Sequence, residues 1–349
     1  MLPVAENEDV LVTVENGVGL LTLNRPKAIN SLTHGMVTAL ADALHTWEGD
    51  ADVHTVLLDG AGERGLCAGG DVVALYHSAK AGGAEARRFW FEEYQLNAYI
   101  SHYPKPYVAL MDGIVMGGGV GVSAHGGVRV VTDRTKMAMP EVGIGFIPDV
   151  GGTYLLSRAP GLLGYHAALS GAPFSGADAI AMGFADHYVP HDRLGDFRSA
   201  VIADGVDAAL AAHTAEPPAS DLAAQREWID ECYASETVAD IVAALRAHGA
   251  GPANDAADLI GTRSPVAVAV ALESIRRAAK LDTLEDVLRD EYRVSCASLR
   301  SHDFVEGIRA QLVDKDRNPT WSHRSVADVT RADVDAYFAP ADPELTFPE

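Results

Sequence analysis

The sequence predicts an α/β protein with a largely helical carboxyl-terminal region. Between residues 10 and 190, short apolar segments typical of strands alternate with periodic segments typical of helices, and glycine turns join several of them. Beyond Asp192 the segments are mostly alanine-rich and periodic, which favours helices. Adjacent prolines at 217–218 make residues 213–220 a linker. We therefore expect a core over residues 1–212 and a helical region over residues 213–349.

The first elements expected are a hairpin and a helix. Residues 10–14 and 19–23 alternate around an Asn-Gly pair at 16–17, the dipeptide that best marks a tight hairpin turn. Thr33 is placed to cap a helix over residues 35–48, because its hydroxyl can accept a hydrogen bond from the first helical turn. The apolar residues of that segment share one face of a helix: Met36, Leu40, Ala43, Leu44 and Trp47.

Further strands and helices follow in alternation. The expected strands span residues 55–59, 107–111, 128–132, 136–139 and 185–189. A helix should begin near Asp71, and the other helices expected in this part span residues 85–101, 119–124, 152–158, 164–169 and 175–182. Those of the second region span residues 221–234, 237–248, 254–262, 265–280, 284–300 and 303–312.

The charge of the chain limits its partners. The 349 residues carry a formal net charge of −22, and 48% of them are hydrophobic, which is ample for a sizeable core. Nucleic-acid binding needs a basic face to neutralise phosphates, so we expect no nucleic-acid partner. Any phosphate-bearing ligand would need a local basic patch.

The cysteines and the apolar runs indicate a cytoplasmic protein. Cys67, Cys232 and Cys296 have no metal-ligand spacing and cannot all pair within one chain, which favours a reducing compartment and no bound metal. The first ten residues, MLPVAENEDV, lack the basic and apolar regions of a signal peptide. No apolar run is as long as a membrane span, so we expect no membrane partner.

Two glycine turns follow predicted strands and precede predicted helices. One is Cys67-Ala68-Gly69-Gly70-Asp71, and the other is the run Gly117–Gly119. Each could be a plain tight turn or a close helix–strand contact. As a pair, they could direct two free backbone N–H groups at one carbonyl oxygen, which is the arrangement of an oxyanion hole.

Two carboxylates lie in the apolar, glycine-punctuated segment that follows. Glu141 comes after Met139-Pro140, and Asp149 comes before Val150-Gly151-Gly152. Glu141 could be a carboxylate at a helix start and Asp149 could cap the helix at Gly151. Alternatively, carboxylates near backbone donors suggest acyl chemistry, with the acids acting as a base or a nucleophile.

These motifs resemble the crotonase (enoyl-CoA hydratase/isomerase) superfamily, and most of all its 3-hydroxyisobutyryl-CoA hydrolase branch. The resemblance rests on four stretches of sequence: NRPK at 24–27, CAGGD at 67–71, MGGG at 116–119 and MPEVGIGFIPDVGGTYLL at 139–156. It extends to EEYQLN at 92–97 and to HDFVEGIRAQLVDKDRNPTW at 302–321, so it covers nearly the whole chain. It implies a crotonase-like ββα spiral core, with a helical carboxyl-terminal region that completes an acyl-CoA site.

The resemblance also assigns roles to single residues. It makes the amides of Gly70 and Gly118 the oxyanion hole for a thioester carbonyl, Glu141 the main catalytic carboxylate and Asp149 its partner. It places Glu93 on the substrate side. The other substrate-binding residues that it implies are Asp71 and Lys27, with Arg309 and Lys315 as further cations for the phosphates of coenzyme A.

Two departures from the hydratase pattern favour a hydrolase. Hydratases of the family usually carry a second catalytic glutamate where this chain has Gly121, which has no side chain for acid–base work. They usually have glycine where this chain has Asp149. The resemblance therefore implies hydrolysis of a short 3-hydroxyacyl-CoA, such as 3-hydroxyisobutyryl-CoA in valine degradation.

Several alternatives stay open at this point. Glu141 could act as a nucleophile or as a general base. The chain could instead be an enoyl-CoA hydratase or isomerase, or an acyl-CoA-binding protein without activity. No cofactor is expected besides the coenzyme A of the substrate. Family members commonly form trimers or hexamers, so a homo-oligomer is one expectation, and a monomer whose helical extension covers the usual contact is the other.

Overall fold

The protein is described here by a computed structural model that covers residues 8–348. Its contacts divide the chain into two compact units, each assembled from three stretches. The sheet unit comprises residues 8–70, 95–137 and 174–221, and the helical unit comprises residues 71–94, 138–173 and 222–348. The α/β class expected from the sequence is confirmed.

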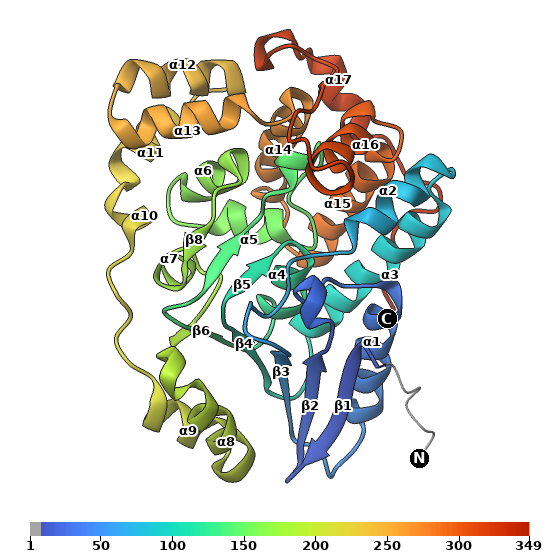
Figure 1. The fold of residues 1–349 in the computed structure, drawn as a ribbon, viewed down its shortest axis with the longest axis vertical. Coiled ribbons are helices and arrows are strands. Elements are labelled where there is room, and N and C mark those ends of the chain that lie inside the picture. The colour runs from blue at the N-terminus through green and yellow to red at the C-terminus, as the bar shows by residue number, and fades with distance from the viewer. Residues whose placement is uncertain (1–7, 349) are drawn as a thin grey trace. The chain divides into compact units, whose positions relative to one another are not determined.

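The sheet unit is built on a six-stranded sheet with the order β1-β2-β3-β4-β6-β9. Figure 1 shows β1, β2, β3, β4 and β6 side by side in this order. β1 pairs antiparallel with β2, and every later neighbour pair is parallel. The strands are β1 (Val10–Glu15), β2 (Val18–Leu23), β3 (Thr55–Gly60), β4 (Tyr107–Met111), β6 (Val128–Val131) and β9 (His187–Tyr188). Parallel neighbours require crossover connections, which here contain helices.

The predicted hairpin and first helix are confirmed. Asn16 and Gly17 both have positive φ, at 47° and 78°, as a two-residue turn that follows the strand twist requires. Helix α1 (His34–Glu48) begins where Thr33 accepts a hydrogen bond from Met36 N, and it buries the apolar face that the sequence predicted. One face of the sheet is covered by α8 (Leu194–Asp204) and α9 (Val206–His213), whose apolar residues pack on Leu57, Val108 and Val130.

A small second sheet contains a strand that the sequence did not predict. Its order is β5-β7-β8, with β5 (Ile114–Met116), β7 (Lys136–Ala138) and β8 (Phe174–Ser175). The sequence led us to expect a direct passage from the strand at 107–111 into the glycine turn, but β5 lies between them. β5 runs beside the first glycine turn through a parallel bridge between Cys67 and Val115. Three residues are too short a stretch for an alternating pattern to be recognised.

Other elements of the sheet unit are short. They are the 3-10 helices η1 (Pro26–Ala28) and η3 (His191–Arg193), and the helices α4 (Gly118–Ser123) and α7 (Gly176–Ala181). Helix α3 (Ala84–Ser101) and helix α10 (Asp221–Ala224) each contribute residues to both units.

The helical unit contains the elements that carry the carboxylates. These are α2 (Val72–Lys80), the first part of α3, the 3-10 helix η2 (Glu141–Ile144), α5 (Gly152–Arg158), α6 (Leu163–Ser170) and α15 (Leu284–Ser298). Its other elements are α11 (Arg226–Cys232), α12 (Val238–His248), α13 (Gly251–Gly261), α14 (Pro265–Ala278), α16 (His302–Ile308), the π-helical turn η4 (Arg309–Val313), η5 (Val326–Asp328), α17 (Arg331–Asp335) and η6 (Ala336–Phe338). Stacked and tilted rings of Trp90, Phe146 and Phe304 join α3 to the segments around η2 and α16.

Three further observations concern the expectations about membranes, metals and cysteines. Among residues 8–348, no helix combines the length and the apolar character needed to cross a bilayer. Over the same residues, no group of three or more His, Cys, Asp or Glu side chains is arranged to hold a metal ion. All three cysteines are buried, and no disulfide bond joins any of them within residues 8–348.

Candidate active site

The two glycine turns lie against each other in the sheet unit. Cys67 N donates to Ile114 O at 3.1 Å, and Met116 N donates to Cys67 O at 2.9 Å. A Cβ atom built on Gly69 would lie 3.3 Å from Met116 O and 3.8 Å from Gly118 N. Gly69 also has a φ of +105°, which side chains rarely adopt. The approach of the two turns therefore requires glycine at this position.

The amides of Gly70 and Gly118 are available in this arrangement. Within residues 8–348, neither N–H donates to a protein acceptor, whereas those of Cys67, Ala68 and Met116 do. Gly118 is the first residue of α4 and is buried, and a first-turn N–H has no partner inside its own helix. A buried N–H without an acceptor is rare in a folded protein, so the amide of Gly118 suits a ligand oxygen; Gly70 is half-buried.

The helical unit brings four carboxylates together. Glu93 comes from α3, Glu141 from the start of η2, Asp149 from the loop before α5, and Glu291 from α15. Their residues are 2%, 7%, 5% and 1% exposed, respectively. Within the described chain, none of the four forms an ion pair with a basic side chain. Burial of unpaired charge is costly, so such a cluster favours bound protons or a polar ligand.

Glu141 has one carboxylate oxygen without a partner. It is the first residue of η2, which agrees with the alternative that placed this carboxylate at a helix start. Its carboxylate accepts a hydrogen bond from its own backbone N–H. Its Oε2 is buried and has no hydrogen-bond partner among residues 8–348. Burial first, and then the charge of Asp149, raise the pKa of Glu141 well above its usual value. An unpaired oxygen of this kind can accept a proton from water or attack a carbonyl carbon.

Asp149 is held by Tyr94, one residue after Glu93 on α3. The Tyr94 hydroxyl donates to Asp149 Oδ2 at 2.6 Å and lies 2.7 Å from Ser295 Oγ. Burial raises the pKa of Asp149 to about 7, while the Tyr94 hydrogen bond lowers it. Its carboxylate does not cap α5, because the N–H groups of Gly151 and Thr153 donate to Glu291 and that of Gly152 donates to the backbone oxygen of Asp149. The alternative in which Asp149 caps that helix is therefore wrong.

Glu93 also lies in this cluster with an unsatisfied oxygen. Its Oε1 is buried without a hydrogen-bond partner. Burial, reinforced by the charge of Asp149, raises the pKa of Glu93 well above its usual value. A buried polar atom without a partner suits a group supplied by a ligand.

Glu291 is a member of the cluster that sequence reasoning missed. Its neighbours Asp290 and Arg293 are charged, so the segment resembles a solvated helix face. The available signal was periodicity, because Glu291 shares a face with Leu288 and Ser295, which are buried. Burial raises the pKa of Glu291 to about 8 against the opposing effect of its hydrogen bonds to Thr153 and Gly151.

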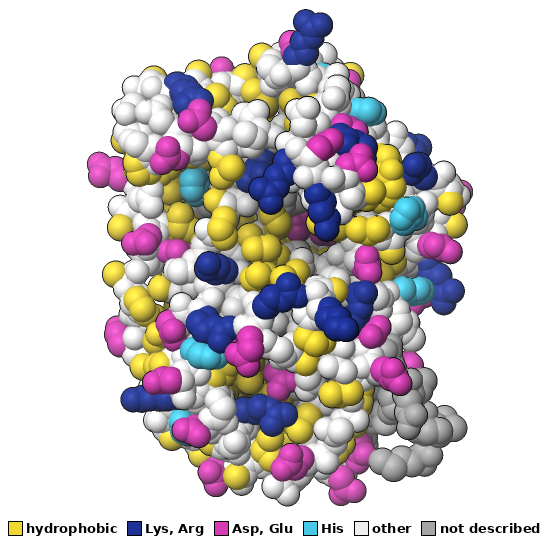
Figure 2. Space-filling view, in the orientation of Figure 1, with side chains coloured by type: hydrophobic (Ala, Val, Ile, Leu, Met, Phe, Trp, Pro, Cys, Tyr) yellow, Lys and Arg dark blue, Asp and Glu magenta, His cyan; other side chains and the backbone are white. Residues whose placement is uncertain are grey.

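The remaining predicted binding residues are not members of the carboxylate cluster. Asp71 is the N-cap of α2, and its carboxylate accepts a hydrogen bond from Ala74 N at 3.4 Å. Lys27 is exposed on η1. Arg309 pairs with Glu306, Asp314 and Asp316. Figure 2 shows Lys and Arg side chains among acidic ones on the face drawn, so cations are present there despite the net charge of −22.

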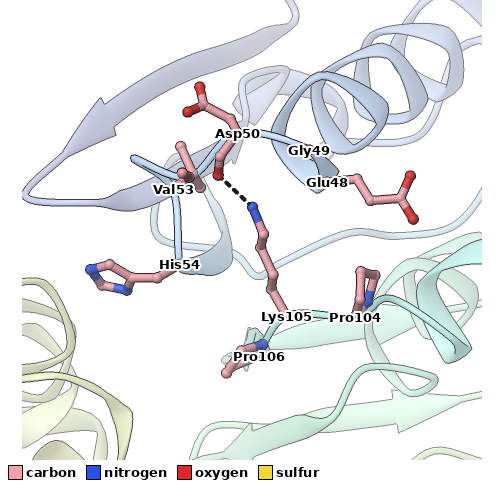
Figure 3. Close-up of a pocket in the computed structure, with 9 residues that line it drawn as sticks. Glu48, Gly49, Asp50, Val53, His54, Pro104, Lys105 and Pro106 are labelled. Atoms are coloured by element: carbon pink, nitrogen blue, oxygen red, sulfur yellow. Dashed lines mark hydrogen bonds between the residues drawn. The ribbon is translucent and has the colours of Figure 1, made fainter.

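A surface pocket of about 370 Å³ in the sheet unit contains none of the predicted site residues. It lies between the end of α1 and the start of β4, and its lining includes Glu48, His54 and Lys105 (Figure 3). The Lys105 ammonium donates to the carbonyls of Trp47 and Asp50, the latter at 2.7 Å. The side chain therefore serves to join two segments of the chain.

Solved structures share this fold at high similarity. A carnitinyl-CoA dehydratase from Mycobacterium thermoresistibile is 77% identical, with a TM-score of 0.96 over 98% of this chain and 99% of that one. An enoyl-CoA hydratase from Rhodobacter sphaeroides 2.4.1 is 40% identical, with a TM-score of 0.92 over 97% of this chain and 100% of that one. The crotonase-like fold expected from the sequence is confirmed.

Comparison of sequences leads to the same family. The family model described as enoyl-CoA hydratase/isomerase matches residues 18–338. The mitochondrial 3-hydroxyisobutyryl-CoA hydrolase of Danio rerio is 39% identical over 98% of this chain and 92% of its own length. The enzymes of the same name from Rattus norvegicus and Homo sapiens are 38% and 37% identical, each over 95% of this chain. The chain therefore belongs to the enoyl-CoA hydratase/isomerase (crotonase) family, and over most of its length it is similar to 3-hydroxyisobutyryl-CoA hydrolases.

Proposed function

We propose that this protein hydrolyses short 3-hydroxyacyl-CoA thioesters, with 3-hydroxyisobutyryl-CoA as the leading substrate. The observation that carries the proposal is the buried pair of Glu141, with its unpaired Oε2, and Asp149, held by Tyr94. Relatives at 37–39% identity that are named for this activity support it.

In the proposed reaction, the free amides of Gly70 and Gly118 bind the thioester carbonyl. As the carbonyl carbon becomes tetrahedral, its oxygen gains negative charge, and each donor lowers the barrier by about 3 kcal/mol. The two amides together would then contribute about 6 kcal/mol. The net charge of the protein disfavours such an anion in general, so local donors are essential to the proposal.

Glu141 supplies the group that attacks, directly or through water. As a nucleophile, its carboxylate oxygen bonds to the carbonyl carbon, the C–S bond breaks and CoA leaves as the thiol after taking up a proton. Water then cleaves the resulting mixed anhydride and restores the carboxylate. As a general base, Glu141 removes a proton from water, and the hydroxide attacks the same carbon. The C–S bond then breaks, and the leaving thiolate takes up the proton from Glu141. Both routes consume one water and yield one acid and one thiol.

Asp149 and Glu93 give the proposed site its preference for a 3-hydroxyl group. Both are buried, and Glu93 Oε1 has no hydrogen-bond partner in the part of the chain that the structure describes. A substrate hydroxyl would donate to one of these carboxylates, whereas a plain acyl chain would leave the buried oxygen unpaired. Sites built to bind a hydroxyl discriminate strongly against analogues that lack it. In this proposal, Lys27 contacts the phosphates of coenzyme A and Asp71 lines the substrate site.

A second candidate function is dehydration or hydration of an acyl-CoA. It is favoured by the solved structure named carnitinyl-CoA dehydratase, at 77% identity, and by the one named enoyl-CoA hydratase, at 40%. Against it, Gly121 offers no second acid–base side chain, and Asp149 stands where hydratases of the family usually have glycine. Loss of enoyl absorbance on incubation with crotonyl-CoA would identify the hydratase.

The proposal is tested by following release of free thiol from a panel of acyl-CoA esters. The panel contains 3-hydroxyisobutyryl-CoA, isobutyryl-CoA, 3-hydroxybutyryl-CoA, butyryl-CoA and carnitinyl-CoA. We expect the 3-hydroxy esters to be hydrolysed at least about 100-fold faster than their plain counterparts. Equal rates within each pair would contradict the role given to Glu93 and Asp149. No thiol release from any member would leave an acyl-CoA-binding protein without hydrolase activity.

A further inference from the structure

Glu291 is a buried acid that the proposed reaction does not use. Its Oε2 accepts from Gly151 N at 2.7 Å, and its Oε1 accepts from Thr153 N at 3.0 Å and from Thr153 Oγ1 at 2.5 Å. Each of these donors belongs to the segment that follows Asp149. A carboxylate from a helix distant in the sequence therefore fixes the backbone beside a proposed catalytic group.

The backbone that Glu291 holds is strained. Val150 has a φ of +55° and Gly151 a φ of +76°, so two consecutive residues adopt the left-handed conformation. This conformation is unfavourable for a β-branched residue such as Val150, which is also buried. Strained residues persist where surrounding contacts hold them, and here three hydrogen bonds to one carboxylate do so.

The next turn of the same helix holds the side chain of Asp149. Ser295 lies four residues after Glu291, hence on the same face of α15. Its hydroxyl is 2.7 Å from Tyr94 Oη, and Tyr94 in turn donates to Asp149 Oδ2. Helix α15 thus supports Asp149 in two ways. Glu291 binds the backbone at 151–153, and Ser295 contacts Tyr94, which donates to Asp149.

Helix capping alone is a weak explanation of Glu291. The first N–H groups of α5 do need acceptors, but a serine or aspartate at the position of Gly151 would be the ordinary N-cap. A distant buried carboxylate is costly by comparison. It also adds a fourth buried carboxyl group to a cluster that already contains Glu93, Glu141 and Asp149.

The charged groups around this cluster make the effect of Glu291 measurable. The titratable side chains that face one another are Glu93 and Tyr94 from α3, Glu141 from η2, Asp149 from its loop and Glu291 from α15. Arg263 packs against η2 near Gly143, but its Nε donates to Ser170 O. The charge of Glu291 is one of the causes that raise the pKa of Glu141.

We propose that Glu291 is a positioning residue for thioester hydrolysis: by holding the turn at 151–153 it fixes the position of Asp149. This inference rests on the proposed function, since it assigns a role within the same reaction. It concerns a residue that does not itself touch the substrate.

The first test is the variant Glu291→Gln in the full chain. The amide has the same size, but its NH₂ group must face either the Gly151 or the Thr153 donors, so at least one hydrogen bond is lost. We expect kcat for 3-hydroxyisobutyryl-CoA to fall on the order of 10- to 100-fold, while KM changes by less than about twofold. The matched control is Glu344→Gln, because Glu344 pairs with Arg293 on the same helix and does not contact the turn. The control should keep the wild-type kcat.

The second readout does not depend on activity. In protein labelled with ¹³C at the glutamate carboxyls, the resonance absent from Glu141→Gln identifies Glu141, and its titration midpoint can be followed without ligand. In Glu291→Gln that midpoint should change, because the turn that positions Asp149 is no longer fully held and the charge of Asp149 is a cause of the raised pKa of Glu141. Glu344→Gln should leave it unchanged. An unchanged midpoint and an unchanged kcat in Glu291→Gln would each overturn the proposal.

A pair of variants at Thr153 covers the case in which Glu291→Gln does not fold. Thr153→Val removes the hydroxyl that donates to Glu291 but keeps the backbone bond, and Thr153→Ser restores a hydroxyl. A several-fold loss of kcat in the first that the second recovers would support the proposal, and wild-type kcat in folded Thr153→Val would overturn it. If the wild-type chain hydrolyses no acyl-CoA, the proposed function fails, and the midpoint of Glu141 alone decides whether Glu291 acts on it.

Discussion

Replacing Tyr94 with phenylalanine removes the hydroxyl that donates to Asp149, and we expect the pH profile of hydrolysis to move to higher pH. The ring itself should be retained, because Tyr94 is fully buried and packs edge-on against Tyr292 at 6.3 Å. Ser295 keeps a partner, since its hydroxyl also donates to Glu291 O at 2.9 Å. The variant therefore tests one hydrogen bond with little other disturbance.

The size of the shift follows from the hydrogen bond to Asp149. A bond to a charged acceptor stabilises by about 1.5–3 kcal/mol, and one pKa unit corresponds to about 1.4 kcal/mol. The Tyr94 bond lowers the pKa of Asp149, which burial has raised to about 7. Its loss should raise that pKa by roughly one to two units. If ionised Asp149 is required, the rate at neutral pH falls by about 5- to 50-fold and recovers at alkaline pH.

The assay is thiol release from 3-hydroxyisobutyryl-CoA, with kcat/KM recorded across the neutral and alkaline range. Tyr292→Phe is the matched control, because it removes a hydroxyl from the neighbouring ring and that hydroxyl bonds with Cys296. Its profile should coincide with the wild type. A Tyr94→Phe profile with an unmoved or lowered midpoint would refute the reasoning, as would an equal loss of rate at every pH.

Three further variants test the stability and the selectivity of the site. Folding raises the pKa of Asp149 from 3.8 to about 7. The protonated side chain therefore makes its full contribution to the free energy of unfolding below about pH 4, and this contribution is lost as the pH rises to about 7. Relative to the wild type, Asp149→Asn should therefore become more stable by up to about 4 kcal/mol as the pH is raised from about 4 to about 7. The same stability difference between variant and wild type at both pH values, measured by urea unfolding, would contradict this reasoning. Gly119→Ala places a Cβ 2.6 Å from Cys67 O, so we expect the free energy of unfolding to fall by about 1–3 kcal/mol, measured by thermal or urea unfolding. Wild-type stability would show that the glycine turns can separate. Glu93→Gln should narrow the preference for 3-hydroxyisobutyryl-CoA over isobutyryl-CoA, and an unchanged ratio of kcat/KM values would remove Glu93 from substrate recognition.

Local chemistry made parts of the fold predictable. The turn at Asn16 and Gly17 needs positive φ at both residues, and few dipeptides accept it, so the hairpin could be located from two letters. Thr33 caps its helix as expected, because a capping side chain acts on N–H groups only two or three residues away. The helix expected to begin near Asp71 does so, and Asp71 is its N-cap. Strand β5 could not be located, since its three residues form no pattern.

The candidate site was predictable only in part. Glycine turns and the Glu141–Asp149 segment could be recognised, because their residue types are unusual for the elements around them. Glu291 could not, because its partners lie 138 and 140 residues away along the chain and its neighbours are charged. The interleaving of two units from six stretches likewise depends on distant contacts. The division at residue 212 remains a prediction.

The most direct test of the account compares wild-type protein with Glu141→Gln in thiol release from 3-hydroxyisobutyryl-CoA. The amide keeps the size of Glu141 and removes its ability to attack a carbonyl or to accept a proton from water. We expect hydrolysis by the wild type and a loss of at least about 1,000-fold in the variant, with the unfolding transition retained. Substantial turnover by folded Glu141→Gln would contradict the account.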